Sequence, residues 1–203
     1  SREILAIGVF TASLLITIIL GWKTGNAVYL KYLMVVCALS GLILLWTMAR
    51  IYVMPTIPAW NSWNTPLSFV STALSLGLLT LLFLNAGGSI SIAAHIIRVF
   101  LIALITILLI EIASALVHQY KLSIMEQGMD GPVFDKGAFY RVFLFRIAVL
   151  VFSCQLVLVM FLKPDLLPGN SNTLWISLLF VTVIAQELMG RLLFYASYFR
   201  LGV

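Results

Sequence analysis

Six long apolar segments alternate with short polar ones along the chain. Each is about 20 residues long, the length that an α-helix needs to cross a hydrocarbon core of about 30 Å. They predict helices over residues 4–20, 32–53, 67–84, 96–117, 140–162 and 173–195. The segments are continuously apolar, whereas the strands of a membrane β-barrel alternate. The pattern therefore predicts an all-α fold, a polytopic transmembrane helix bundle with six spans in this chain.

Composition supports the same class. Hydrophobic residues make up 63% of the chain, charged residues 9%, and the mean hydropathy is +1.14. These values are typical of an integral membrane protein and exclude an ordinary soluble domain. No connection is long enough for a separate soluble domain, so we expect residues 1–203 to form a single transmembrane domain.

Six spans place both termini on one face of the membrane, which we call side A. The connections 54–66 and 118–139 share side A, and the other connections lie on side B. Lysine and arginine are more frequent toward side A, where we count Arg2, Arg50, Lys121, Lys136, Arg141, Arg146, Arg191 and Arg200, than toward side B, where we count Lys23, Lys31, Arg98 and Lys163. The positive-inside rule would make side A cytoplasmic.

Ionisable residues inside the spans lie mainly in the half near side A. Glu111 and Arg146 each lie about 9 Å from that face at 1.5 Å per residue, and Glu187 lies in the same half of the last span. Each such residue costs roughly 2.5 to 3.5 kcal/mol to insert, and it usually faces the bundle interior or a wet cavity. Buried ion pairs that hold helices together would explain each residue singly. The one-sided distribution of the whole set favours a functional site.

Glu187 and Arg191 are four residues apart on one helix, in the acid-before-base order that favours an ion pair. Gly190 beside them would allow close approach of a neighbouring helix. Tyr195 continues the same helix face toward side A. We expect Glu187 to orient Arg191 and the face to line a site.

The connection 54–66 combines prolines, tryptophans and amides. Pro55, Pro58 and Pro66 should restrict the backbone and stop the flanking helices. Trp60 and Trp63 are suited to lie at the headgroup level with their indole N–H groups in water, and a membrane-interface belt alone would explain them. The amides of Asn61 and Asn64 add hydrogen-bond donors and acceptors.

Several chemistries have no motif in the chain. The phosphate-loop, HExxH zinc and Gly-x-Ser-x-Gly patterns are missing from the sequence. Cys37 and Cys154 are two thiols, too few for an ordinary iron–sulfur cluster. His95 and His118 lie at opposite ends of one span, which does not suit two axial ligands of a haem. We therefore expect no haem, iron–sulfur cluster or metal in this chain.

Three stretches carry a family resemblance. "SREIL" at 1–5, "ARIYVMPTIPAWNSWNTPLSF" at 49–69 and "QELMGRLLFYASYFRLGV" at 186–203 resemble the membrane anchor subunits of dimethyl sulfoxide reductase and related molybdopterin oxidoreductases. Anchors of this family have eight helices. The resemblance therefore implies that this chain lacks about two N-terminal helices of the full-length subunit.

The resemblance also implies a function. Family anchors oxidise a quinol, usually menaquinol, in anaerobic respiration, and pass electrons to an iron–sulfur subunit of the four-cluster type, which supplies a molybdopterin catalytic subunit. It implies a bacterial or archaeal cytoplasmic (inner) membrane with side A outside the cytoplasm. On this orientation the resemblance and the positive-inside count disagree, and we follow the resemblance.

The acid that the family associates with quinol binding maps onto Glu3, which we take as the proton acceptor. Without the resemblance, Glu3 would be interpreted as a first-turn acid favoured by the helix dipole. The connection 54–66 is then a rigid lid that also docks the iron–sulfur subunit. The other candidate quinol-binding residues are Arg50, Tyr52, Trp60, Asn61, Trp63, Asn64, Arg191 and Tyr195, with Glu111, Arg146 and Glu187 in support.

Two alternatives stay open at this point. An ion-coupled or small-solute transporter could use the intramembrane glutamates and arginines, although it should expose ionisable groups to both faces. A purely structural anchor would leave electron transfer to its partners.

Overall fold

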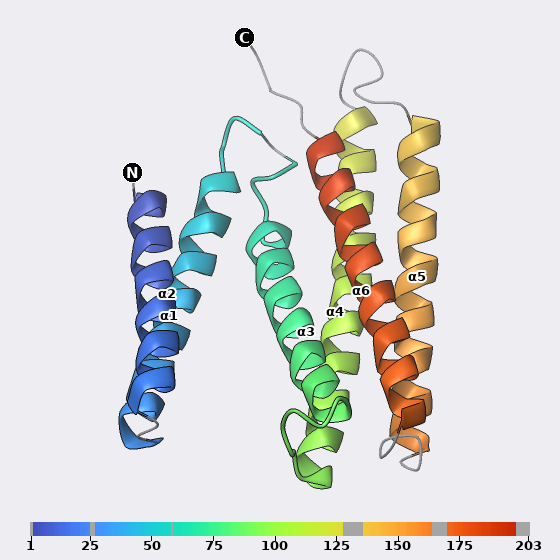
Figure 1. Ribbon diagram of the computed structural model, residues 1–203. Helices are drawn as coiled ribbons and strands as arrows, with labels where there is room; N and C mark the ends of the chain where they lie inside the picture. Colours follow the sequence, from blue (N-terminus) through green and yellow to red (C-terminus); the bar gives the residue numbers. More distant parts are fainter. Residues whose placement is uncertain (1, 25–26, 58, 128–135, 164–169, 198–203) are drawn as a thin grey trace.

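A computed structural model describes residues 2–24, 27–57, 59–127, 136–163 and 170–197 (Figure 1). These residues form six helices and no strand: α1 (Arg2–Thr24), α2 (Ala27–Tyr52), α3 (Asn64–Ala86), α4 (Ala94–Gln127), α5 (Lys136–Leu162) and α6 (Asn170–Ala196). All six are long and apolar enough to cross a membrane. The predicted all-α, six-span bundle is confirmed. The start of α1 and the ends of α2, α4 and α6 all lie toward one face in Figure 1, which is side A.

α4 is longer than the sequence predicted. We expected a connection over residues 118–139, but α4 continues to Gln127 and α5 begins at Lys136. Residues 118–127 contain neither glycine nor proline, and Leu122 is buried in a cluster with Phe139. Hydrophobic contact at side A therefore keeps this segment helical. At 1.5 Å per residue α4 is roughly 51 Å long, so it extends beyond a hydrocarbon core of about 30 Å.

The connection between α2 and α3 is shorter than predicted. It covers residues 53–63, which we call the strap, and Asn64, Thr65 and Pro66 form the first turn of α3. Pro66 therefore begins a helix rather than stopping one, because the first N–H groups of a helix have no intrahelical partner and the N–H that proline lacks is not needed there. Pro55 lies in the strap, and Pro58 lies outside the described residues.

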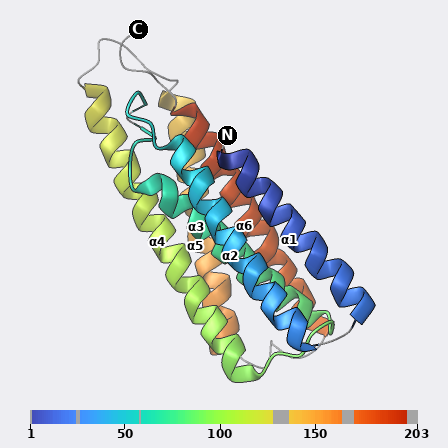
Figure 2. The same cartoon turned by 90° about the vertical axis from the view of Figure 1, so that its left-hand side faces the viewer.

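Helices α3 to α6 surround the main hydrophobic core. Its fully buried members include Leu79 on α3, Leu104 on α4, Leu150 on α5 and Leu179 on α6. α1 packs on α2, and α2 joins the other four helices through α3. Figure 1 shows this division into an α1–α2 pair and a group of four, and in Figure 2, turned by 90°, the pair lies in front of the group. The α1–α2 pair therefore sits at the margin of the group of four, and α2 and α3 share one boundary.

Candidate functional site

The strap is attached to the end of α6 by Trp60. Its indole Nε1 donates a hydrogen bond to the Phe194 carbonyl oxygen at 2.8 Å, and its ring stacks on Phe194 with centroids 4.8 Å apart. The hydroxyl of Thr65 donates to the Trp60 carbonyl at 2.6 Å. Trp60 is only 8% exposed, so the prediction of a water-facing indole is wrong for it, whereas Trp63 is 83% exposed. The partner that buries Trp60 comes from a helix 134 residues away in sequence.

Beneath the strap, tyrosines from two helices meet. The hydroxyl oxygens of Tyr52 and Tyr195 are 3.2 Å apart, within hydrogen-bond distance. The Tyr52 ring stacks on the Phe69 ring with centroids 5.6 Å apart. The Arg191 guanidinium carbon lies 4.1 Å from the centre of the Phe69 ring. The structure thus places Tyr52 and Arg191 against Phe69, and Tyr195 against Tyr52.

A pocket of about 300 Å³ opens on the other side of the strap, and we call it the strap pocket. It contains three of the predicted residues, Arg50, Asn61 and Trp63. Ser62 also lines it, and the Ser62 hydroxyl oxygen is buried without a hydrogen-bond partner. The full lining is Trp46, Ala49, Arg50, Val53, Asn61, Ser62, Trp63 and Pro66. The pocket therefore offers a cation, an amide and an unpaired hydroxyl at the side A end of α2 and α3.

A separate apolar groove between α1, α2 and α3 lies nearer side B than the strap pocket. Its volume is about 690 Å³, and its walls include Leu45 on α2 and Val70 on α3. Each of these residues lies four positions, or one helical turn, from a residue of the strap pocket: Leu45 from Ala49, and Val70 from Pro66. The pocket and the groove therefore follow the same α2–α3 boundary, with polar groups at the side A end and apolar walls below.

Glu3 lies beside this region on α1. The antiparallel register of α1 and α2 is set by the hydroxyls of Ser13 and Ser40, 2.9 Å apart, and by Phe10, whose ring approaches Gly41. Because α1 and α2 are antiparallel, counting ten residues toward side A from Ser13 and from Ser40 leads to Glu3 and Arg50, which therefore lie at about the same depth. Glu3 does not line the strap pocket itself. It lies on the neighbouring helix at the same depth.

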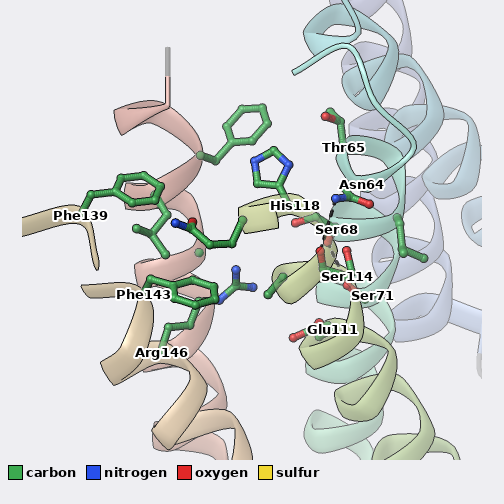
Figure 3. A pocket seen from close by; sticks show the side chains of 16 residues that line it. Asn64, Thr65, Ser68, Ser71, Glu111, Ser114, His118, Phe139, Phe143 and Arg146 are labelled. Atoms are coloured by element: carbon green, nitrogen blue, oxygen red, sulfur yellow. Dashed lines mark hydrogen bonds between the residues drawn. The ribbon is translucent and has the colours of Figure 1, made fainter. Parts of the chain in front are cut away.

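A second cavity lies inside the group of four helices, between α3, α4, α5 and α6 (Figure 3). We call it the inner cavity, and its volume is about 60 Å³. Figure 3 shows Glu111, Arg146 and His118 around it, from α4 and α5. Asn64 also lines it and donates a hydrogen bond to the Ser114 carbonyl at 3.3 Å. Glu111 and Arg146 thus share one cavity, as their common depth predicted.

A chain of hydrogen bonds joins three helices beside this cavity. The Thr72 hydroxyl donates to Glu187 Oε2 at 2.6 Å. The Gln186 amide nitrogen donates to Glu187 Oε1 at 2.9 Å and to Glu111 Oε2 at 3.0 Å. Gln186 is fully buried, and Glu111 and Glu187 are 5% and 7% exposed. One amide therefore holds two buried carboxylates.

The predicted ion pair between Glu187 and Arg191 is wrong. Within the described part of the chain the two side chains do not pair: Glu187 turns to Thr72 and Gln186, and Arg191 lies over Phe69. Neighbouring helices supply these partners, and spacing along one helix does not reveal them. Gln186 was missed by the sequence analysis, although a glutamine inside an apolar span next to a glutamate is a signal for it.

Among the described residues, three atoms of this cluster find no hydrogen-bond partner: Glu111 Oε1, Arg146 Nε and Gln186 Oε1. All three are buried. Glu111 and Arg146 line the inner cavity, so their unpaired atoms belong to groups that border open space. A buried polar group without a partner is unfavourable unless water or a ligand reaches it.

Gly190 admits the Arg146 side chain. A Cβ atom built on Gly190 would lie 2.8 Å from both the Arg146 guanidinium carbon and Nη2. Gly190 was expected to admit a neighbouring helix, and the atoms that the structure places there belong to an α5 side chain rather than to a helix backbone. The absence of a side chain at position 190 therefore sets the place of the guanidinium.

We predict that Gly190→Ala lowers the melting temperature of the protein in detergent, whereas Gly77→Ala does not. An added methyl group at position 190 displaces the half-buried Arg146 guanidinium, and overpacking costs about 1–3 kcal/mol. Gly77 has no atom within 4 Å of such a methyl group, so alanine there should stabilise α3 by about 0.5–1 kcal/mol. A rise of the melting temperature in both variants would show that Arg146 moves freely.

A family model described as "DMSO reductase anchor subunit (DmsC)" matches residues 1–197. Comparisons with curated proteins and with solved structures gave no match.

Proposed function

The chain belongs to the family of DMSO reductase anchor subunits, and we propose that its function is to oxidise menaquinol and pass the electrons to an iron–sulfur subunit. Membership of this family implies association with the catalytic and iron–sulfur subunits of a DMSO reductase at a membrane. In the proposal the iron–sulfur subunit is of the four-cluster type, the catalytic subunit carries molybdopterin, and side A lies outside the cytoplasm of a bacterial or archaeal cell.

The observation that carries this proposal is the strap pocket with its apolar groove. Small-molecule sites usually measure about 300–1,000 Å³, with mostly apolar walls and a few polar groups. The strap pocket has about 300 Å³, and the groove adds apolar walls along α2 and α3. A quinol has a ring with two hydroxyl groups and a long hydrocarbon tail. The ring fits the polar end at side A, and the tail fits the groove.

The polar groups of the pocket match the two ring oxygens. Arg50 and the Asn61 amide can donate hydrogen bonds to the quinol and to the quinone, and the unpaired Ser62 hydroxyl can donate or accept one. Oxidation of the quinol releases two electrons and two protons. The electrons pass to the iron–sulfur subunit, so this chain needs no haem or cluster of its own. A carboxylate near the ring must accept a proton, and Glu3 lies level with Arg50 on the adjacent helix.

The transporter alternative has less support. Within the described spans, Glu111, Arg146, Glu187 and Arg191 lie in the half near side A, and Glu111 and Glu187 are buried there. Toward side B, Lys31 and Arg98 lie in the first two turns of α2 and α4 and are exposed. A substrate pathway through the membrane would place ionisable groups within reach of both faces. The family match also favours an anchor over a transporter.

Binding of a quinol analogue to the purified complex tests the proposed site. We expect Arg50→Leu to raise the Kd of the analogue about 10- to 100-fold, because a hydrogen bond to a charged group contributes about 1.5–3 kcal/mol. Arg141→Leu is the matched control, since Arg141 is also exposed at side A but lies outside the strap pocket. Fluorescence titration measures both affinities. Equal affinities in the two variants would place the ring elsewhere.

A further inference from the structure

The inner cavity and its polar cluster are separate from the strap pocket. Thr72 on α3, Glu111 on α4, Arg146 on α5, and Gln186 and Glu187 on α6 form the cluster, and none of them lines the strap pocket. Four helices thus contribute polar side chains to one point inside a membrane bundle. Such groups are costly there and are usually retained for function.

The cavity has room for water where the cluster lacks partners. Its volume of about 60 Å³ exceeds the roughly 10–15 Å³ that a cavity needs to hold one water molecule. Glu111 Oε1 and Arg146 Nε are unpaired, and both residues border this space. A buried water needs two to four polar partners, and Ser68 and Ser71 supply further hydroxyl groups in the lining. Water in the cavity would therefore connect Glu111 to Arg146.

The cavity extends toward side A along α4. His118 and Gln119 line it, and they lie in the part of α4 that follows the predicted apolar span. On the other side of the cluster, Glu187, Arg191 and Tyr195 follow one another at four-residue spacing on α6. Tyr195 contacts Tyr52, which lies two residues from Arg50. Polar side chains therefore lie at one-turn intervals on α6 between the strap and Glu187, and others line the cavity from Glu111 toward side A.

We propose that the Glu111–Gln186–Glu187 cluster accepts one of the two quinol protons and releases it to side A through water in the inner cavity. The inference rests on the proposed function for the source of the proton. Quinol oxidation yields quinone, two electrons and two protons. The electrons reduce the iron–sulfur subunit, one proton goes to Glu3, and the other passes by Tyr52 and Tyr195 to the Glu187 carboxylate. Gln186 holds the two carboxylates together, and Glu111 opens to the cavity.

Labelling with dicyclohexylcarbodiimide, an apolar reagent that reacts with protonated carboxyl groups, tests whether the cluster holds a proton. The assembled complex in detergent is treated with the reagent and digested, and the adducts are located by mass spectrometry. We expect an adduct on Glu111 or Glu187 that decreases as the pH is raised and is lost in the double variant Glu111→Gln, Glu187→Gln. Absence of an adduct on both glutamates would overturn the proposal.

Turnover measurements separate this inference from the proposed function. We expect Glu111→Gln to slow quinol-dependent turnover at least tenfold while leaving the affinity of a quinol analogue unchanged. Ser153→Ala is the control, because Ser153 is fully buried and bonded to Thr182 but lies outside the cavity. If Glu111→Gln assembles poorly, Glu187→Gln should show the same slowing.

Failure of the proton route and failure of the proposed quinol oxidation would give different experimental results. Normal turnover in both glutamine variants would overturn the proton route and leave the quinol site intact. A wild-type complex that oxidises no quinol, yet is labelled at Glu111, would instead overturn the proposed function and leave the cluster as a proton-holding site.

Discussion

Glu3→Gln should leave the complex assembled and slow quinol oxidation about 100-fold or more. The amide keeps the size and shape of the carboxylate but cannot accept a proton, and a positioned general base typically contributes about 10²- to 10⁴-fold to a rate. Glu3 lies half-buried at the side A end of α1, level with Arg50. Quinol-dependent turnover and subunit content of the purified complex are the two measurements.

Arg2→Gln is the matched control for this result. Arg2 is the adjacent residue, is exposed, and lies in the same first helical turn. We expect its removal to leave turnover close to that of the wild type. If Glu3→Gln turned over normally, Glu3 would be only a first-turn acid that interacts with the helix dipole, and the proton acceptor would have to be sought elsewhere.

The largest loss of stability is expected from Gln186→Leu. The amide nitrogen of Gln186 donates to both Glu111 and Glu187, so leucine deprives two buried carboxylates of a donor at once. A hydrogen bond to a charged group contributes about 1.5–3 kcal/mol, and the loss of two predicts a decrease of about 3 kcal/mol or more. Unfolding in detergent, followed by circular dichroism, measures it.

Gln155→Leu is the control for this substitution. Gln155 lies on α5 and is exposed on the outside of the helix group. Leucine there should be neutral or stabilising, because it removes a polar group from the lipid-facing surface. A decrease no larger for Gln186→Leu than for Gln155→Leu would mean that water replaces the amide without loss.

The helices could be predicted from the sequence because the bilayer sets their length. Each apolar segment matched one observed helix, and the mismatches fall at ends where contacts decide. α4 continues to Gln127 because Leu122 finds Phe139 as a packing partner, a contact that hydropathy does not report. Pro66 was expected to stop a helix but lies in the first turn of α3, because composition does not show where a proline lies relative to that turn.

The depth of a residue in the membrane could also be predicted from the sequence, but the rotation of each helix about its own axis could not. Equal distances from side A correctly grouped Glu111 with Arg146 at one cavity. The direction in which Glu187 points depends on how α6 is turned against α3 and α4, and the structure shows Thr72 and Gln186 as its partners instead of Arg191. For the same reason the burial of Trp60 against Phe194 could not be predicted from the strap alone.

The candidate residues consequently divide into neighbouring groups at side A. Arg50, Asn61 and Trp63 line the strap pocket. Tyr52 and Arg191 lie against Phe69, with Tyr195 beside Tyr52. Glu111 and Arg146 border the inner cavity, where Asn64 also lies. In this account the first group binds the quinol ring, the second lies beside it, and the third belongs to the proton route.

Reduction of the partner's iron–sulfur clusters by menaquinol would show whether this subunit oxidises quinol at the strap pocket. The purified complex is mixed with menaquinol without oxygen, and cluster reduction is followed by electron paramagnetic resonance. We predict rapid reduction in the wild type and in Arg141→Leu, and little or none in Ser62→Trp, whose side chain would fill the strap pocket. Clusters that are reduced equally fast in Ser62→Trp, or that stay oxidised in the wild type, would contradict the account.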